Sequence, residues 1–107
     1  MSKVLLITGA SRGIGAETAR LAAARGYALC LNYRHSEKEA NDLLESLVAG
    51  GHRAILFQAN VADEAEVEAM YHAIDREFGR LDGLVNNAGI LERHSNCLLY
   101  TSDAADE

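Results

Sequence analysis

Three glycines near the N-terminus have the spacing of a loop that brings a phosphate group against the protein backbone. Gly9, Gly13 and Gly15 stand between an apolar run and a stretch of helix-forming residues. At such a junction the N–H groups of a helix N-terminus attract negative charge, and side chains at the glycine positions would block a diphosphate. A tight turn that merely uses glycine is the alternative. A nucleoside-triphosphate loop is excluded, because no Gly-Lys-Ser/Thr sequence closes the segment.

The end of the next apolar run predicts which dinucleotide the loop would hold. In a dinucleotide-binding fold this point meets the adenine ribose, and an acidic residue there selects NAD by accepting a hydrogen bond from the 2′-hydroxyl. The chain has Asn32-Tyr33-Arg34 here, and its next acidic residue, Glu37, belongs to the following helix. Arg12 and Arg34 could instead face a 2′-phosphate, because a guanidinium group matches phosphate oxygens. We therefore expect NADP, with NAD as the alternative if Arg34 is only a solvated loop residue.

The loop needs a strand before it and a helix after it, and the chain alternates such elements throughout. Unbroken apolar runs predict strands buried on both faces, as in a parallel sheet, and the stretches between them predict helices. Right-handed crossovers between these elements give an α/β fold. We expect a Rossmann-like, doubly wound parallel sheet of order 3-2-1-4, truncated after the fourth strand. The predicted strands are 3–8, 28–31, 54–57 and 81–86, and the predicted helices are 16–25, 37–49 and 64–78.

Signals for helix starts and buried faces mark the second and third helices. Ser36 and Glu39 have the spacing of a capping box, and Asp63 is followed by Glu66 in the same way. Behind each cap, apolar residues recur at three- and four-residue intervals, which indicates one buried stripe per helix. The two stripes are Ala40, Leu43, Leu44, Leu47 and Val48, and Val67, Met70, Tyr71, Ile74 and Phe78.

The glycine loop, together with a second motif, resembles the short-chain dehydrogenases/reductases. The segment Thr8-Gly9-Ala10-Ser11-Arg12-Gly13-Ile14-Gly15 is similar to the cofactor loop of that family, and Asn86-Asn87-Ala88-Gly89 is similar to its second characteristic motif. The resemblance covers Lys3 to Ser95 and is nearest to glucose-dehydrogenase-like and 3-oxoacyl-carrier-protein-reductase-like members. It implies hydride transfer between NADP(H) and a small carbonyl or alcohol substrate in the full-length protein.

The resemblance also assigns residues to the cofactor. Asn60 takes the place of an acidic residue that faces the adenine amino group, and its amide oxygen can accept the same hydrogen bond. An Asn in a plain strand-end turn is the alternative. Asn86, Ala88 and Gly89 are implied to lie along the ribose and nicotinamide; Asn87 is expected to tie neighbouring strands together and is also kept as a candidate. The candidate cofactor-binding residues are Gly9, Ser11, Arg12, Gly13, Ile14, Gly15, Tyr33, Arg34, Asn60, Val61, Asn87, Ala88 and Gly89.

The residues that carry the family's proton transfer do not occur in this chain. By resemblance, a tyrosine exchanges a proton with the substrate, a lysine four positions later lowers the tyrosine pKa, and a serine polarises the carbonyl. None of the four tyrosines is followed by such a lysine, and in the family the pair comes after a fifth strand, beyond residue 107. We therefore assign no catalytic residue and expect the chain alone to be inactive. The alternatives are a stand-alone dinucleotide-binding module without catalysis and a fragment that folds poorly.

The sequence changes character near residue 95. We expect 1–95 to be the N-terminal part of a dinucleotide-binding domain. Residues 96–107 do not resemble the family and look like translated adaptor or vector sequence, with a natural divergent tail as the alternative. In the complete fold a fifth strand should cover the outer edge of the fourth, because a bare edge is a site for aggregation.

Composition limits the other functional classes. The 107 residues are 49% hydrophobic and carry a net charge of −6 without a basic run, which argues for a globular domain and against nucleic-acid binding. No apolar run approaches a membrane span or a signal peptide. Cys30 and Cys97 form no CxxC pair and the histidines show no ligand spacing, so we expect no metal and a cytoplasmic protein. We expect the full-length protein to be a homo-oligomer.

Overall fold

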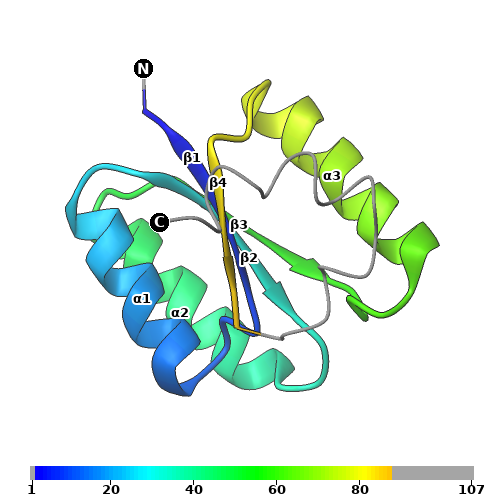
Figure 1. Ribbon diagram of the computed structural model, residues 1–107. Helices are drawn as coiled ribbons and strands as arrows, with labels where there is room; N and C mark the ends of the chain where they lie inside the picture. Colours follow the sequence, from blue (N-terminus) through cyan, green and yellow to red (C-terminus); the bar gives the residue numbers. More distant parts are fainter. Residues whose placement is uncertain (1, 88–107) are drawn as a thin grey trace.

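A parallel β-sheet forms the centre of the molecule, as the alternation of strands and helices predicts. The computed structural model describes residues 2–87. Neighbouring strands run parallel in the order β3-β2-β1-β4 (Figure 1), which confirms the predicted order 3-2-1-4. In chain order the elements are β1 (Val4–Thr8), α1 (Gly13–Ala24), β2 (Ala28–Tyr33), α2 (Glu37–Ala49), β3 (Ala54–Gln58), α3 (Glu64–Phe78) and β4 (Gly83–Asn86).

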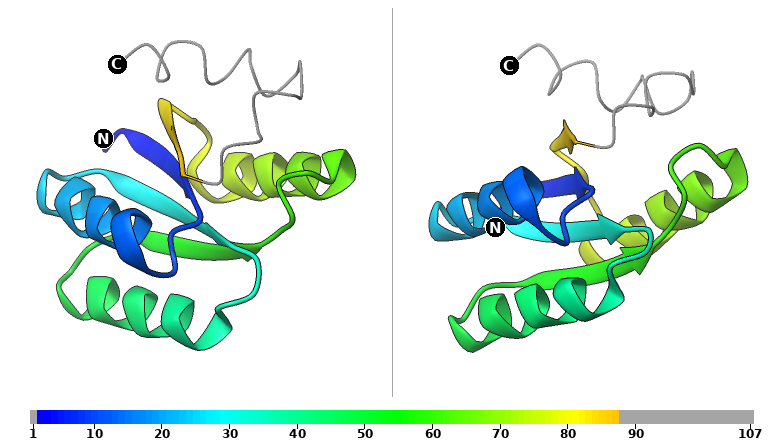
Figure 2. Two further views of the ribbon diagram at one scale, coloured as in Figure 1. Left: turned by 60° about the horizontal axis from the view of Figure 1, so that its bottom comes forward. Right: turned by 90° about the horizontal axis from the view of Figure 1, so that it is seen from below.

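Helices cover both faces of the sheet, α1 and α2 on one face and α3 on the other (Figure 2). Successive strand residues therefore enter different apolar clusters: Leu6 packs on the α3 side, and Ile7 packs on the α1 and α2 side. Cys30 and Leu31 of β2 divide in the same way. This two-sided burial explains why the strands are unbroken apolar runs. The helical residues that complete the clusters are Val67, Met70 and Ile74 on one side, and Ala16, Ala19, Ala22, Ala23, Leu43 and Leu47 on the other.

Two elements around the glycine loop are longer than predicted. Helix α1 begins at Gly13 instead of residue 16, because the loop itself turns into the helix, with Arg12 as an extended N-cap residue. Strand β2 continues past residue 31 to Tyr33, because its last two residues pair with Phe57 and Gln58 of β3. Both changes bring the predicted cofactor residues closer to regular secondary structure.

The helix signals are confirmed for α3 and only partly for α2. The side chain of Asp63 accepts a hydrogen bond from the Glu66 N–H (3.2 Å), as a capping residue should. Ser36 is the N-cap residue of α2, but its side chain makes no capping hydrogen bond. Val48 was expected on the buried stripe and is 54% exposed. At about 100° per residue, it lies about 80° around the helix from Ala40, at the margin of the stripe.

Asp82 fastens the start of β4 to β1. Its backbone N–H donates to the Val4 carbonyl (2.8 Å), and its carboxylate accepts from the Val4 N–H (2.7 Å). The same carboxylate accepts two hydrogen bonds from the Arg80 guanidinium, at 2.8 and 2.7 Å. The hydrogen bonds from Arg80, and secondarily that from Val4, hold the pKa of Asp82 below its usual value.

Candidate functional site

The glycine loop lies at the carboxyl end of the sheet, between β1 and α1. Gly9 and Gly13 have φ values of +60° and +64°, which side chains disfavour. Gly15 is needed for space instead, because a Cβ there would stand 2.2 Å from the carbonyl oxygen of Gly9. The loop thus packs its backbone directly against the first turn of α1 and leaves Gly13 exposed. This is the geometry that lets a diphosphate approach backbone N–H groups.

Asn32, a buried residue of β2 that the motifs did not mark, holds the loop in place. Its side-chain oxygen accepts a hydrogen bond from the Gly9 N–H (3.3 Å), and its backbone carbonyl accepts one from the Ala10 N–H (2.9 Å). Its side-chain nitrogen donates to the carbonyls of Ala59 (3.1 Å) and Phe57 (3.4 Å). The available signal was a polar residue inside an apolar strand, since buried polar groups must find partners.

The arginines predicted to face a 2′-phosphate stand on segments at this end of the sheet. Arg12 precedes α1 and Arg34 follows β2, and both residues are exposed. The Arg34 carbonyl accepts a hydrogen bond from the side chain of Gln58 (3.1 Å), which fixes the backbone from which the guanidinium extends. Ser11, Arg12 and Gly13 line an open hollow of about 330 Å³ between the starts of α1 and α2. The other residues that line it are Ala16, Arg20, Glu39, Asp42 and Leu43.

Acidic groups of α2 also border this hollow, and one of them is paired. Asp42 accepts a hydrogen bond from Lys38 Nζ (3.0 Å), and this bond raises the pKa of Lys38. Both side chains are well exposed, so the pair adds little stability. Its effect on the site is to offset part of the negative charge that α2 brings to the hollow.

Asn60 follows β3 and is fixed by two local hydrogen bonds. Its side-chain oxygen accepts from the Ala62 N–H (2.9 Å), and its own backbone N–H donates to a carboxylate oxygen of Glu66 (2.8 Å). The strand-end turn that was the alternative for Asn60 therefore exists. An amide oxygen has a second lone pair, so the turn still leaves an acceptor for an adenine amino group. Glu66 reaches past the cap residue to this turn, a role that its sequence position does not reveal.

The carboxyl end of β4 contributes the second motif. Thr8 is fully buried and donates from its hydroxyl to the side-chain oxygen of Asn86 (3.2 Å), so Asn86 ties β4 to β1. The expectation gave a tie between strands to Asn87; both asparagines are exposed, and the side-chain bond from β4 to β1 is made by Asn86. Ala88 and Gly89 lie outside the described residues.

The remaining candidates differ widely in exposure. Ile14 is 78% exposed beside the loop, an uncommon position for a large apolar side chain. Tyr33 and Val61 are 8% and 5% exposed, because Tyr33 belongs to β2 and Val61 packs in the cluster under α3. A cofactor would reach only a small part of these two residues, and a large part of Ile14.

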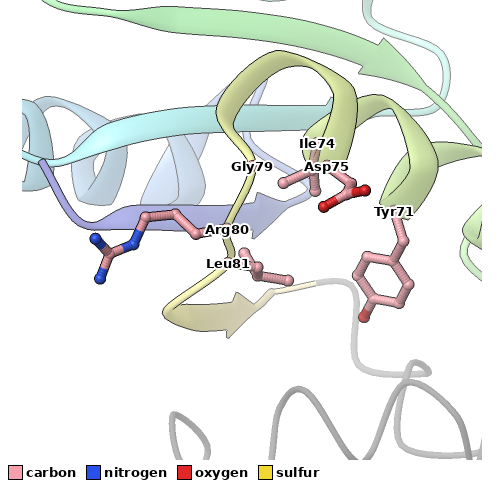
Figure 3. A pocket seen from close by; sticks show the side chains of 6 residues that line it. All are labelled: Tyr71, Ile74, Asp75, Gly79, Arg80 and Leu81. Atoms are coloured by element: carbon pink, nitrogen blue, oxygen red, sulfur yellow. The ribbon is translucent and has the colours of Figure 1, made fainter. Parts of the chain in front are cut away.

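A second hollow, of about 220 Å³, lies where α3 ends and β4 begins, at the opposite end of the sheet from the glycine loop (Figure 3). Tyr71, expected on the buried stripe of α3, is half-buried on its wall. Four positions after Tyr71 the chain has Asp75 instead of a lysine. The hollow therefore lacks the tyrosine–lysine pair. Its lining residues are Tyr71, Ile74, Asp75, Gly79, Arg80 and Leu81.

The reactive thiol of Cys30 and the possible metal ligands form no further site among the described residues. Cys30 is buried, and this burial raises its pKa to about 12, so the thiol stays protonated near neutral pH. Within residues 2–87, no three His, Cys, Asp or Glu side chains come together as a metal site requires. Nor does any helix in this range combine the length and apolarity needed to cross a bilayer.

The doubly wound sheet, the loop after β1 and the asparagine motif after β4 define the class of protein. A family model described as short chain dehydrogenase matches residues 3–107. The chain belongs to this family.

The chain spans about a third of the length of the relatives that it matches. The 3-oxoacyl-[acyl-carrier-protein] reductase FabG of Staphylococcus aureus is 48% identical over 90 residues, which are 84% of this chain and 37% of the reductase. A blue fluorescent protein from a metagenomic library, solved in complex with NADPH, is 42% identical with a TM-score of 0.78, over 82% of this chain and 36% of its own. A variant of actinorhodin polyketide ketoreductase, solved with NADPH, is 35% identical with a TM-score of 0.75, over 80% and 33%.

Proposed function

We propose that this chain is the cofactor-binding part of an NADP(H)-dependent oxidoreductase that interconverts a small carbonyl compound and the corresponding alcohol. When bound, the nicotinamide dinucleotide supplies the hydride transfer, and residues of this chain bind and orient it. The observation that carries the proposal is the open glycine loop at the start of α1, with Arg12 and Arg34 at the same end of the sheet. The last residues of β2 include no carboxylate that would favour NAD.

The site offers a separate contact for each part of the dinucleotide. The N–H groups of the loop between Gly9 and Gly15 would bind the diphosphate, and the helix N-terminus behind them would favour its negative charge. Arg12, Arg34 and the hydroxyl of Ser11 would hold the 2′-phosphate. On the adenine side, Asn60 would accept from the amino group beside the edges of Tyr33 and Val61. Ile14 would give an apolar contact. Asn86, Ala88 and Gly89 would follow the ribose and nicotinamide, as the family resemblance implies, with Asn87 kept as a further candidate.

Solved relatives support the choice of NADP. Two of the similar structures contain NADPH, and a further one, from Burkholderia cenocepacia, contains NADP and is 31% identical with a TM-score of 0.74. The reductase names of the relatives support a carbonyl substrate. The residues that bind this substrate and transfer the proton would come from sequence beyond residue 107. We also propose that the full-length protein is cytoplasmic and homo-oligomeric.

One alternative function keeps the dinucleotide-binding site but has no catalytic activity. Because the chain has no Tyr-x-x-x-Lys pair, it could instead be a dinucleotide-binding module without catalysis. Sequencing the gene downstream of codon 95 in an independent clone separates the two proposals. A Tyr-x-x-x-Lys sequence some tens of codons later supports the oxidoreductase, and a stop codon near residue 107 supports the module.

The cofactor preference is tested with Arg34→Ala, measured against both dinucleotides. A hydrogen bond to a charged group contributes about 1.5–3 kcal/mol, so the variant should bind NADP about ten- to a hundredfold more weakly. NAD, which lacks the 2′-phosphate, should bind the variant and the wild type alike. Arg76→Ala, which removes an exposed arginine from the last turn of α3, is the matched control for lost charge. Equal losses for both dinucleotides, or none, would remove the basis for NADP.

A further inference from the structure

Asn32 occupies a strand position from which both loops of the site are reached. Strand β2 lies between β1 and β3, and Asn32 is its next-to-last residue, opposite Phe57 in the register. On one side the β1 strand runs into the glycine loop at Gly9. On the other, β3 runs into the turn that carries Ala59 and Asn60. A side chain at this point of β2 therefore faces the ends of two different loops.

The carboxamide of Asn32 makes three hydrogen bonds, to Gly9 after β1 and to the end of β3 and the residue that follows it. It is 2% exposed, so water does not compete for its partners. Its oxygen accepts from Gly9, and its nitrogen donates to the carbonyls of Phe57 and Ala59, residues 23, 25 and 27 positions away in sequence. A carboxamide has two N–H donors, and both find an acceptor here. No other natural side chain of this size offers an acceptor on one side and two donors on the other.

The glycine loop, which Asn32 binds at Gly9, is also packed closely against the first turn of α1. The carbonyl oxygen of Gly9 lies so close to Gly15 that a Cβ there would come within 2.2 Å of it. Gly9 is therefore bound to Asn32 at its N–H, and its carbonyl oxygen lies directly against the first turn of α1. On the β3 side, Ala59 directly precedes Asn60, whose backbone is bound to Glu66. Asn32 thus connects two segments that other contacts also constrain.

We propose that Asn32 is a positioning residue of the cofactor site: its carboxamide fixes the diphosphate loop at Gly9 relative to the adenine-side turn at Ala59 and Asn60. The proposal rests on the proposed function, since the two segments are taken as contacts to opposite ends of one dinucleotide. Asn32 itself is buried and is proposed to act through these segments, not by contact with the cofactor. It sets the distance between groups that do.

Two variants separate the two halves of this contact. Asn32→Leu is similar in size and removes all three side-chain hydrogen bonds. Asn32→Asp keeps the acceptor for Gly9 and loses both donors, so that near neutral pH a carboxylate faces the carbonyls of Phe57 and Ala59. On protonation the acid regains one O–H donor, which restores part of the contact. Ile74→Val, which shortens a buried side chain of α3 and removes none of these hydrogen bonds, is the control for a general loss of stability of about 0.5–1.5 kcal/mol.

The first measurement is the dissociation constant for NADPH, made on the protein at its full gene-encoded length. We expect a loss of at least about tenfold for Asn32→Leu and less than about twofold for Ile74→Val. For Asn32→Asp, the ratio of its dissociation constant to that of the wild type should fall by at least about threefold between about pH 8 and about pH 5.5. The ratio cancels the titration of the 2′-phosphate, which affects both proteins alike. The partners of Asn32 are backbone groups and do not titrate. Affinities of both Asn32 variants that match the control at every pH would overturn the proposal.

The second measurement is independent of any ligand. Hydrogen exchange of the Gly9 amide, which loses its acceptor, should be at least about tenfold faster in Asn32→Leu than in the wild type. Exchange of the Ala10 amide, whose acceptor is the backbone carbonyl of residue 32, should rise less, and both rates should be unchanged in Ile74→Val. If the wild type binds neither NADPH nor NADH, the proposed function fails, and the exchange rates alone decide whether Asn32 positions the loop. Equal protection of these amides in Asn32→Leu and the control would overturn the proposal in that case as well.

Discussion

Replacing Gly15 by alanine should damage the site while the rest of the fold persists. The added Cβ would lie 2.2 Å from the Gly9 oxygen and 3.0 Å from the Ala10 Cα, whereas ordinary contact begins at 3.4 Å. All of the crowded atoms belong to the backbone, so no side chain can swing aside. The Gly9 peptide must move away from α1 by about 1 Å, which also pulls it from Asn32.

Two effects of opposite sign decide the stability of Gly15→Ala. Alanine is about 1 kcal/mol better than glycine inside a helix, which favours the variant. Overpacking against fixed atoms costs about 1–3 kcal/mol, which opposes it. We expect a net loss of up to about 2 kcal/mol in the free energy of unfolding. The loss in cofactor affinity should be larger than about tenfold, because the displaced N–H groups no longer converge on the diphosphate.

The assay compares Gly15→Ala with Ala22→Gly. Ala22 lies two turns further along α1, and glycine there costs about 1 kcal/mol of helix stability without touching the loop. Titration by NADPH fluorescence gives the affinity, and thermal unfolding by circular dichroism gives the stability. We expect similar melting temperatures and an affinity loss confined to Gly15→Ala. If that variant binds NADPH as tightly as Ala22→Gly does, the loop backbone is not the diphosphate site.

Other predictions concern stability and turnover. Asp82→Asn should lower the free energy of unfolding by about 1 kcal/mol near neutral pH, because an amide binds Arg80 less strongly than a carboxylate does. Folding lowers the pKa of Asp82. The carboxylate therefore stabilises the fold above its pKa in the unfolded chain, and this stabilisation is lost as the pH falls through its pKa in the folded protein. In thermal melts, the stability difference between Asp82→Asn and the wild type should disappear below about pH 4. Asp63→Ala should cost about 1 kcal/mol and Ser36→Ala almost nothing in the same melts, because only Asp63 makes a capping hydrogen bond. The purified 107-residue chain should not reduce carbonyl substrates with NADPH, and spectrophotometric turnover would contradict the missing proton-transfer pair.

The strand order could be read from the sequence because each of its causes is local. Four unbroken apolar runs, three connecting helices and one glycine loop leave few right-handed arrangements, and the reversal beside β1 selects one of them. The two ends of α3 could also be predicted from the sequence, since Asp63 and Gly79 mark them. Local chemistry determines both features, so no knowledge of distant contacts was needed.

The parts that escaped prediction depend on contacts between distant segments. Asn32 has partners 23 to 27 residues away, and nothing in its neighbours specifies them. The tie between Thr8 and Asn86 joins residues 78 positions apart, so the choice between the two asparagines depended on how β4 meets β1. Glu66 has the spacing of a capping residue, but in the fold it binds the backbone of Asn60 instead. In each case side-chain direction, which tertiary packing sets, decided the partner.

The burial of Cys30 gives the protein a built-in reporter of its own opening. Only the thiolate reacts with alkylating reagents, and with a pKa of about 12 this form is scarce at the pH of such reactions. Reagents must therefore wait until the sheet separates from α3, which encloses the thiol together with Met70 and Ile74. The rate at which Cys30 is labelled then measures how often that side of the molecule unfolds. A substitution that loosens only the apolar cluster under α1 and α2 would leave this labelling rate unchanged. The Cys30 thiol therefore distinguishes opening on the α3 face of the sheet from opening on the other face.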